Sequence, residues 1–343
     1  MSASPMQVAV VGCGLIGSRR AREAATHAGT DVRLAVDAEL TRAQALGADH
    51  ACAASAAWRD AVDDPAVDIV VVATPNGLTT DIAEAALAAG KHVLIEKPPG
   101  RNLYEAGRLA AAAARAAGIL KIGFNHRYHP AVSAAHALVA SGTLGPVLNV
   151  RARYGHGGRP GYEREWRGNP ELAGGGELLD QGVHLADLVC WFAGEPIAAQ
   201  AMVQTAAWPI APLEDNAFAL LRCATGAIAS LHTSWTQWKN LFSFEVACQR
   251  GAVAVEGLGG SYGPERLVVA RRVLSGGPPQ MEERAFDGPD ESWRLEWEDF
   301  HRAIQTGAPY LGTPDDGVRA MRVIDMIYGA VQRTDAEAHA AAI

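Results

Sequence analysis

A glycine-rich segment near the start of the chain, Gly12-Cys13-Gly14-Leu15-Ile16-Gly17, follows a short apolar run and precedes a helical stretch. Glycines in such a turn let a pyrophosphate approach a helix N-terminus, where unpaired N–H groups favour negative charge. Asp37 follows Gly17 by 20 residues, at the end of the second predicted strand, where a carboxylate accepts hydrogen bonds from ribose hydroxyls. The alternatives are a structural turn and, for Asp37, a helix N-cap. The predicted dinucleotide contacts are Gly12, Gly14, Leu15, Ile16, Gly17 and Asp37.

Asp37 also bears on the choice of cofactor. A carboxylate repels a 2′-phosphate, and the nearest downstream arginine, Arg42, is five residues further along. These residues favour NAD over NADP.

Two further motifs stand at the ends of predicted strands. Thr74-Pro75-Asn76 ends the third strand, where open parallel sheets place ligand contacts, although Pro75-Asn76 is also a common turn pair. Glu96-Lys97-Pro98 ends a later strand, and Pro99 comes next. Prolines restrict the chain there, so the Lys97 ammonium could be held near a nicotinamide and stabilise a developing alkoxide. The alternative is an ordinary solvated lysine.

A carboxylate and an imidazole, Asp180 and His184, lie in an apolar segment that we predict as one helix over 177–192. Together with Asp187 they would share one helical face. Imidazole titrates near neutrality, so His184 could take a hydroxyl proton while Asp180 orients it. Gly182 inside this helix indicates close approach of a ligand or of backbone. The alternative is a satisfied core histidine, and we expect no metal because a single imidazole without cysteine makes a poor ligand set.

The elements that must position these residues change in kind after about residue 125. From Gln7 to Phe124, short β-branched runs alternate with alanine-rich helical segments, which predicts a doubly wound α/β domain with a parallel sheet. Beyond Ala198, short β-rich runs separated by turn residues predict an α+β second domain with an antiparallel sheet. We expect an NAD-binding domain over 1–125, a substrate and oligomerisation domain over 126–312, and a C-terminal helix within 313–343 that packs back on the N-terminal domain.

The predicted strands of the first domain are 8–11, 32–36, 69–73, 93–95 and 119–123, and those of the second are 147–154, 199–205, 216–222, 227–234, 242–248, 252–256 and 266–271. Between them, residues 155–176 show no clear period, and loops this long are often functional.

Composition narrows the classes of partner. Acidic residues outnumber basic ones by 38 to 30 and no basic cluster stands out, so we expect no nucleic-acid partner. The five cysteines are widely spaced with no CxxC pair, which favours free thiols in a reducing cytoplasm. We find no signal-peptide pattern and no apolar run of membrane-spanning length, so we expect a cytoplasmic protein with no membrane association.

These motifs together resemble the Gfo/Idh/MocA family. The residues that carry the resemblance are the glycine-rich segment, Thr74-Pro75-Asn76, the run Ala89-Gly90-Lys91-His92-Val93 leading into Glu96-Lys97-Pro98, and Gly174-Gly175-Gly176 leading to Asp180 and His184. The resemblance covers nearly the whole chain. It implies a Rossmann domain and a second domain whose open-faced, mainly antiparallel sheet mediates dimers or tetramers, with the active site between the domains. It also implies an NAD(P)-dependent dehydrogenase or reductase acting on a secondary alcohol or ketone of a sugar, cyclitol or nucleotide-linked sugar.

The resemblance also implies roles for individual residues. Lys97 is similar to the family's catalytic lysine, Asp180 to its acid partner and His184 to its general acid/base, and all three would contact substrate. Trp166-Arg167 resembles the Trp-Arg pair that reaches the cofactor from the second domain. The cofactor would also meet Thr74, Pro75, Asn76, Glu96 and Lys97.

Other positions keep two interpretations. Asn125, His126 and Arg127 lie where the family often has a basic segment, so Asn125 and Arg127 are candidate substrate contacts, with capping of the domain junction as the alternative. Where many members carry a histidine near position 79, this chain has Thr79, and we expect no such contact. Seven further residues are candidates either for sugar stacking and hydroxyl contacts or for roles in the core or a subunit interface. They are Tyr162, Trp166, Trp235, Trp238, Lys239, Asn240 and Tyr262.

Two other functions remain open within the same fold. One is an NAD- and sugar-binding sensor without turnover, and the other is an NAD-dependent glycoside hydrolase. A sensor needs no proton acceptor, so the joint presence of Lys97, Asp180 and His184 favours an enzyme. Net production of NADH would distinguish a dehydrogenase from a hydrolase, which returns its hydride.

Overall fold

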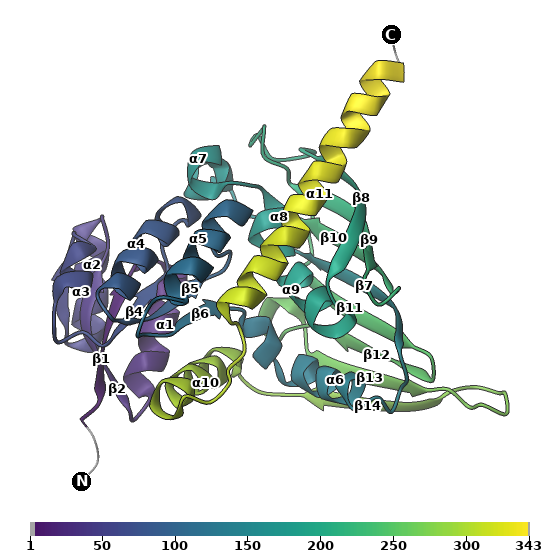
Figure 1. Cartoon of the computed structure of the whole chain (residues 1–343), viewed down its shortest axis with the longest axis horizontal. Helices are drawn as coiled ribbons and strands as arrows, with labels where there is room; N and C mark the ends of the chain where they lie inside the picture. Colours follow the sequence, from purple (N-terminus) through teal and green to yellow (C-terminus); the bar gives the residue numbers. More distant parts are fainter. Residues whose placement is uncertain (1–3, 342–343) are drawn as a thin grey trace. The chain divides into compact units, whose positions relative to one another are not determined.

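The computed structural model describes residues 4–341 and divides into two compact units (Figure 1). Unit 1 comprises Met1–Asn125 with Trp293–Val318, and unit 2 comprises His126–Ser292 with Arg319–Ile343. Residues 293–312, which we expected in the second domain, lie in unit 1 instead, because Trp297 and Phe300 are part of its hydrophobic core. That the C-terminal helix packs back on the N-terminal domain stays a prediction.

Unit 1 is built on a parallel sheet with strand order β3-β2-β1-β4-β5-β6. Its strands are β1 (Met6–Val11), β2 (Thr30–Val36), β3 (Ala53–Ser55), β4 (Ile69–Val72), β5 (His92–Glu96) and β6 (Leu120–Gly123). Its helices are α1 (Leu15–Thr26), α2 (Leu40–His50), α3 (Arg59–Asp63), α4 (Asn76–Ala88), α5 (Leu103–Ala113) and α10 (Ser292–Thr306). The predicted doubly wound fold is confirmed, and only the short β3, which has no β-branched residue, was not predicted.

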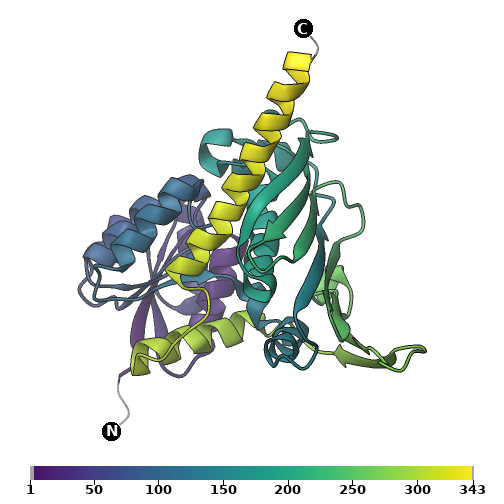
Figure 2. The same cartoon turned by 45° about the vertical axis from the view of Figure 1, so that its right-hand side comes forward.

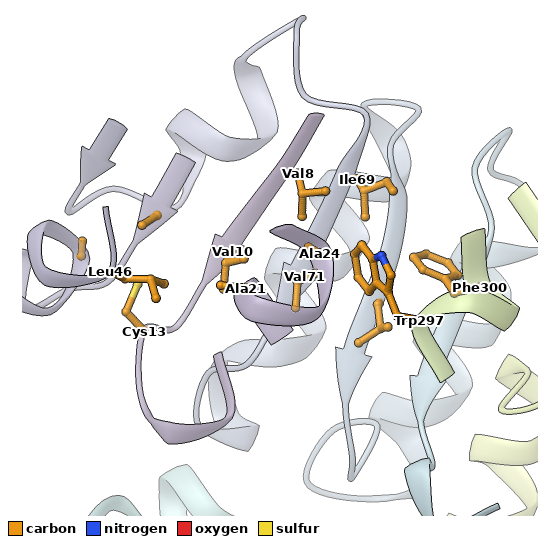
Figure 3. Packing of buried hydrophobic residues seen from close by; sticks show 13 residues of the cluster. Val8, Val10, Cys13, Ala21, Ala24, Leu46, Ile69, Val71, Trp297 and Phe300 are labelled. Carbon is orange, nitrogen blue, oxygen red and sulfur yellow. The ribbon is translucent and has the colours of Figure 1, made fainter. Parts of the chain in front are cut away.

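Alternating strand residues of this sheet form a core with helices α1, α2 and α10. Val8, Val10, Ile69 and Val71 contribute side chains to one buried cluster (Figure 3). Helix α1 adds small residues to it and α10 adds aromatic rings, namely Ala21, Ala24, Trp297 and Phe300. The alanines allow α1 to approach the sheet closely, which explains why this helix is poor in large apolar residues.

The strand order places the cofactor motifs predicted in unit 1 at one edge of its sheet. Parallel strands all end at the same edge, and the order reverses between β1 and β4, which is where such folds bind ligands. The glycine-rich segment follows β1, Asp37 follows β2, Thr74 follows β4, and Lys97 follows β5. The topology therefore gathers motifs that are up to 85 residues apart in the sequence, from Gly12 to Lys97.

The segment after α10 runs along β6. The Ile122 amide donates to the Gly312 carbonyl at 2.7 Å, and the Tyr310 hydroxyl donates to the Leu120 carbonyl at 2.8 Å. Thr313 then caps α11 (Pro314–Ala341): its hydroxyl accepts from the Asp316 amide, and its own amide donates to the Asp316 carboxylate.

Unit 2 contains a sheet of order β14-β13-β12-β11-β7-β10-β9-β8 (Figure 2). All its pairs are antiparallel except β7 with β10. The strands are β7 (Val147–Gly155), β8 (Pro196–Gln204), β9 (Asn216–Cys223), β10 (Ile228–Ser234), β11 (Leu241–Cys248), β12 (Gly251–Glu256), β13 (Glu265–Arg271) and β14 (Gln280–Phe286). The helical elements are η1 (Asn125–Tyr128), α6 (Pro130–Ala140), η2 (Tyr162–Arg164), η3 (Trp166–Gly168), α7 (Pro170–Ala173), α8 (Glu177–Asp180), α9 (Gly182–Ala193) and η4 (Gly260–Tyr262).

The expected α+β domain with a mainly antiparallel sheet is confirmed. Strand β14 was not predicted because its sequence, QMEERAF, is charged and lies mostly exposed at the edge of the sheet. Helices α9 and α6 contact one face of the sheet, α9 against β7 and β10 and α6 against β12 and β13. On β9, Ala217, Ala219 and Leu221 are buried while the alternating Phe218 and Leu220 are exposed, so the other face carries exposed apolar side chains.

Within residues 4–341 no helix is both long enough and apolar enough to cross a membrane. All five cysteines are free thiols, as their spacing predicted.

Two glycines after α10 test the pairing with β6. Gly312 and Gly307 both have positive φ, +72° and +66°, so alanine strains the backbone at either position. A Cβ at Gly312 would also lie 2.4 Å from the Ile122 carbonyl oxygen, whereas no described atom lies within 4 Å at Gly307. We expect Gly312→Ala to lower the free energy of unfolding by about 1 to 3 kcal/mol more than Gly307→Ala in urea titrations. Equal losses would show that the close approach to β6 is wrong.

Candidate active site

The three glycines of the first motif have different structural roles. Gly12 has φ +96°, and a Cβ there would lie 2.5 Å from the Ala73 carbonyl oxygen. At Gly17 a Cβ would lie 1.7 Å from the Gly12 carbonyl oxygen. At Gly14, by contrast, no atom of the described residues lies within 4 Å of the Cβ position. Packing therefore requires the outer two glycines, while the middle one faces open space at the N-cap of α1.

That open space suits an anion. Gly14 has no side chain with which to cap α1, so the N–H groups of the first turn and the helix dipole face outward there. Leu15 is 76% exposed and Ile16 is half-buried. The residues present thus fit a dinucleotide pyrophosphate, as the sequence indicated.

Asp37 is held by two backbone amides. Its Oδ2 accepts from the Cys13 N–H at 2.8 Å, and its Oδ1 accepts from the Glu39 N–H at 2.9 Å. Each carboxylate oxygen keeps a lone pair for a ribose hydroxyl. The N-cap of α2 is Glu39 rather than Asp37, so the capping interpretation of Asp37 is wrong. Glu39 also pairs with Arg42 at 2.8 Å.

The Thr74-Pro75-Asn76 motif leads directly into α4. Pro75 is the N-cap of this helix and Asn76, which is 5% exposed, is its first residue. The Thr74 and Thr79 hydroxyls lie 3.4 Å apart, and Thr79 also donates to the Pro75 carbonyl. Thr79 is 2% exposed, so it packs inside the motif.

Glu96, predicted as a cofactor contact, forms an ion pair inside unit 1. Its Oε1 accepts from Arg20 Nε at 2.6 Å, and Arg20 Nη2 lies 2.7 Å from Glu296 Oε2. Arg20 and Glu296 are fully buried, and the guanidinium also lies over the Trp293 ring at 4.4 Å. Burial raises the pKa of Glu296, and the Arg20 charge opposes this. Lys97, the next residue after Glu96, is half-buried at the end of β5.

Arg20 was missed by the sequence analysis although a signal existed. It lies between Gly17 and Ala21 on the buried face of α1, and an arginine there requires an acidic partner. Asn125, a candidate substrate contact, is buried at the end of unit 1.

In unit 2, the glycine run before Asp180 is explained by close packing. A Cβ at Gly176 would lie 1.9 Å from the Glu214 carbonyl oxygen, which accepts from the Glu177 amide at 3.0 Å. The Glu214 carboxylate accepts from the Leu178 amide at 3.0 Å and from the Tyr328 hydroxyl at 2.8 Å. These bonds fix the start of α8.

The predicted single helix over 177–192 is wrong. The structure has α8 (Glu177–Asp180) and α9 (Gly182–Ala193), joined at Gln181. A Cβ at Gly182 would lie 3.0 Å from Leu178 Cδ1 and 3.2 Å from Thr233 Cγ2, so a tight approach to β10 coincides with the break. Asp180 and His184 therefore belong to different helices rather than to one continuous face.

Asp180 instead meets the predicted Trp-Arg pair. Arg167 Nε donates to Asp180 Oδ2 at 2.7 Å, and the guanidinium lies over the Trp166 ring at 4.4 Å. Tyr162 is 4% exposed beside this pair, and its burial followed by the Asp180 charge raises its pKa. The structure thus brings Trp166, Arg167 and Asp180 together within unit 2.

His184 is 3% exposed and its ring is stacked on that of His126, with centroids 3.7 Å apart. The Tyr154 ring meets His184 edge-on at 6.1 Å. Arg127, a candidate substrate contact, is 3% exposed and ion-paired with Asp187. Its guanidinium is therefore occupied by a carboxylate of the protein itself.

The structure separates the predicted aromatic set. Tyr162 and Trp235 belong to a hydrophobic cluster, against which Trp166 packs. Tyr262 packs on Tyr154 at 5.4 Å, and burial raises the pKa of Tyr262 to about 12. Trp238, by contrast, is 73% exposed. Among residues 4–341, no group of three or more His, Cys, Asp or Glu side chains is arranged to hold a metal ion.

Comparisons with known proteins agree with this architecture. Residues 6–124 match the family described as "Oxidoreductase family, NAD-binding Rossmann fold", and residues 132–254 match "GFO/IDH/MocA C-terminal domain". The chain is 30% identical over 268 residues to 1,5-anhydro-D-fructose reductase of Ensifer adhaerens, covering 75% of each protein. It is 30% identical over 224 residues to levoglucosan dehydrogenase of Pseudarthrobacter phenanthrenivorans, covering 57% of each. A solved structure of GenD2 from gentamicin A biosynthesis, in complex with NAD, is similar at 27% identity with a TM-score of 0.83, over 97% of this chain and 95% of that one.

Gly14 and Gly17 provide a matched test of the dinucleotide site. Gly14 has φ −74°, which alanine adopts freely, so Gly14→Ala should leave the melting temperature of the NAD-free protein unchanged. Its methyl group would occupy the space that faces the pyrophosphate, and we expect NAD to bind about tenfold or more weakly, a loss of about 1.4 kcal/mol. Gly17→Ala should lower the melting temperature even without NAD. Melting curves and calorimetric titration with NAD measure both, and unchanged NAD affinity in Gly14→Ala would contradict the assignment.

Proposed function

The chain belongs to the Gfo/Idh/MocA family of oxidoreductases, and we propose that it transfers hydride between a secondary alcohol of a sugar-like substrate and NAD. The observation that carries this proposal is the pairing, in one chain, of an open dinucleotide loop at Gly14 with a buried His184 that follows the Arg167-bound carboxylate Asp180. The first feature suits a nicotinamide cofactor and the second suits proton transfer from a hydroxyl.

Unit 1 would hold the cofactor. The first turn of α1 would receive the pyrophosphate and Asp37 would accept bonds from the adenosine ribose, while Thr74, Pro75, Asn76, Glu96 and Lys97 would border the remainder. NAD, when bound, accepts the hydride that leaves the carbinol carbon. The carboxylates of Asp37 and Glu39 disfavour a 2′-phosphate, and Arg42 already pairs with Glu39, so NADP is the less suitable cofactor.

Unit 2 would handle the proton. His184, in its neutral form, takes the hydroxyl proton as the C–O bond becomes a carbonyl, and returns it in the reverse reduction. Asp180, fixed by Arg167, would orient the reacting hydroxyl or the imidazole. The Lys97 ammonium would stabilise the alkoxide charge that develops on the same oxygen.

The substrate class rests on the relatives. Their names refer to an anhydrosugar, an anhydroketose and, for a relative in Escherichia coli, a glucoside. We propose that the substrate is a sugar derivative with a free secondary hydroxyl. A panel of candidate substrates should also include cyclitols and nucleotide-linked sugars.

Turnover on such a panel is the direct test of the proposed reaction. We expect NADH absorbance to rise with NAD and one class of sugar, and to rise less or not at all with NADP. Lys97→Ala and His184→Ala should each lower kcat by about 10² to 10⁴-fold while NAD still binds. His50→Ala, at the end of α2, is the matched control and should keep wild-type kcat.

Other outcomes separate the rival functions. Cleavage of a glycoside without net NADH would identify a hydrolase. Tight NAD binding with no turnover on any substrate class would support a sensor. Full activity in His184→Ala would remove the proposed proton acceptor.

We also propose that unit 2 self-associates through the open face of its sheet, as a homodimer or homotetramer. Met202 opposes Phe218 in the β8–β9 register, and their exposed fractions are 71% and 47%. Leu220, 52% exposed, lies two residues further on the same face. A concave region of about 940 Å³ is lined by Arg151, Ala152, Arg153, Gln200, Ala201, Met202, Phe218, Ala219, Leu220, Ser230, Leu231, His232 and Glu245. Exposed apolar side chains on one sheet face are typical of a protein interface.

The five free thiols favour a reducing compartment, and we place the enzyme in the cytoplasm.

Charge on this face should prevent association. We expect Met202→Lys with Leu220→Lys to convert the oligomer to a monomer in light scattering, with an unchanged circular dichroism spectrum. Leu274→Lys, at a 74% exposed position between β13 and β14, is the control and should leave the mass unchanged. A monomeric wild type would show that the face has another use.

A further inference from the structure

His126 and Arg127, in the short helix η1, both contact α9. The His126 ring stacks on the His184 ring, with centroids 3.7 Å apart and planes inclined by 25°. The two residues are 4% and 3% exposed. One face of the proposed proton acceptor is therefore covered by a second imidazole.

An ion pair beside the stack holds the two segments together. Arg127 Nε donates to Asp187 Oδ2 at 2.8 Å, and Arg127 Nη2 donates to Asp187 Oδ1 at 2.6 Å. Arg127 is the residue after His126, and Asp187 is three residues after His184 on α9. A two-point arginine–carboxylate contact fixes angle as well as distance. The ion pair therefore ties the two backbones together close to the stacked rings. It lies one residue from His126 in η1 and about one turn from His184 in α9.

The sheet encloses His126 from other directions. The Tyr154 ring of β7 lies 5.1 Å from the His126 ring, inclined by 59°, and the Phe242 ring of β11 lies 5.6 Å away, edge-on. Tyr154 also meets His184 edge-on, so the same ring contacts both imidazoles. A tilt of His126 would require these rings to move with it, because buried side chains are close-packed.

We propose that His126 is a positioning residue for proton transfer: its flat ring holds the His184 imidazole in one plane, and the Arg127–Asp187 ion pair holds His126 in place. The proposal rests on the function proposed above, in which His184 accepts the hydroxyl proton. A general base works only within hydrogen-bond reach and in line with the proton, so a fixed ring plane contributes to the rate. The ring of residue 126 supplies the contact to His184.

Two substitutions at His126 distinguish a role for its flat ring from a role in filling space alone. We expect His126→Leu to lower kcat by about 10 to 100-fold, because the aliphatic side chain fills the space without a flat face. His126→Phe should restore kcat to within about threefold of wild type. In both variants the KM for NAD and the melting temperature should stay close to wild type, since NAD binds in the other unit.

His136, on helix α6, provides a matched control because it also stacks on a ring of α9. It stacks on Trp191, seven residues beyond His184, with centroids 3.6 Å apart and an inclination of 8°. Burial lowers the pKa of His136 to about 4, so it is uncharged at assay pH. His136→Leu removes an equivalent stack from α9 away from His184 and should leave kcat unchanged.

A proton NMR readout tests the stack without turnover. The His184 ring resonance, identified by its loss in His184→Gln, should lie upfield in the wild type because of the His126 ring current. It should move downfield in His126→Leu and return toward its wild-type position in His126→Phe. If the wild type turns over no substrate, the proposed function fails while these shifts still decide the stack. Loss of kcat in His126→Phe as large as in His126→Leu, or unchanged kcat in His126→Leu, would overturn the positioning role.

Discussion

A buried guanidinium holds together the parts of unit 1 that carry the cofactor motifs. Arg20 projects from α1, the helix that begins at Gly14, and its charge meets Glu96 at the end of β5 and Glu296 on α10. Removing one partner from such a buried pair leaves an uncompensated charge, at a cost of about 3 to 5 kcal/mol. One side chain therefore fixes helix α1, strand β5 and helix α10, which comes from the far end of the chain, against one another.

A second buried cation explains why the chain returns to unit 1 near residue 293. Lys121 of β6 is fully buried and donates to the Leu311 carbonyl at 2.5 Å and to Asp299 at 3.1 Å. Burial lowers the pKa of Lys121, and the charges of Glu296 and Asp299 oppose this shift. Helix α10 supplies acids to both cations and aromatic rings to the core, so it completes unit 1 rather than extending unit 2.

These charges also show what a sequence can and cannot predict. The strands of both sheets except β3 and β14 were predicted because β-branched runs and turn residues are local signals. The cofactor motifs of unit 1 were predicted because each follows such a strand. The placement of α10 was not predicted, because Glu296 and Asp299 look in the sequence like part of an ordinary solvated helix face. They lie inside unit 1 because they pair with Arg20 and Lys121, which are distant in the sequence. Strand β14 escaped for the related reason that an edge strand need not be apolar.

The same limit applies to the candidate site in unit 2. Asp180 and His184 were found from their types and spacing, but the predicted continuous helix gave the wrong geometry. The helix breaks at Gln181, where Gly182 packs closely against Leu178 and against Thr233 of strand β10. The sequence also could not predict the partners of Asp180 and Asp187, because Arg167 and Arg127 contact them only in the folded chain.

Those partners decide how His184 can behave. A lone carboxylate beside a buried imidazole favours the imidazolium and would hold the proton. Here Asp180 pairs with Arg167 and Asp187 pairs with Arg127, and the His184 ring is stacked on a second imidazole. The two acid charges are thereby balanced by two arginine charges. Such a balance of charges suits a residue that must accept a proton in oxidation and return it in reduction.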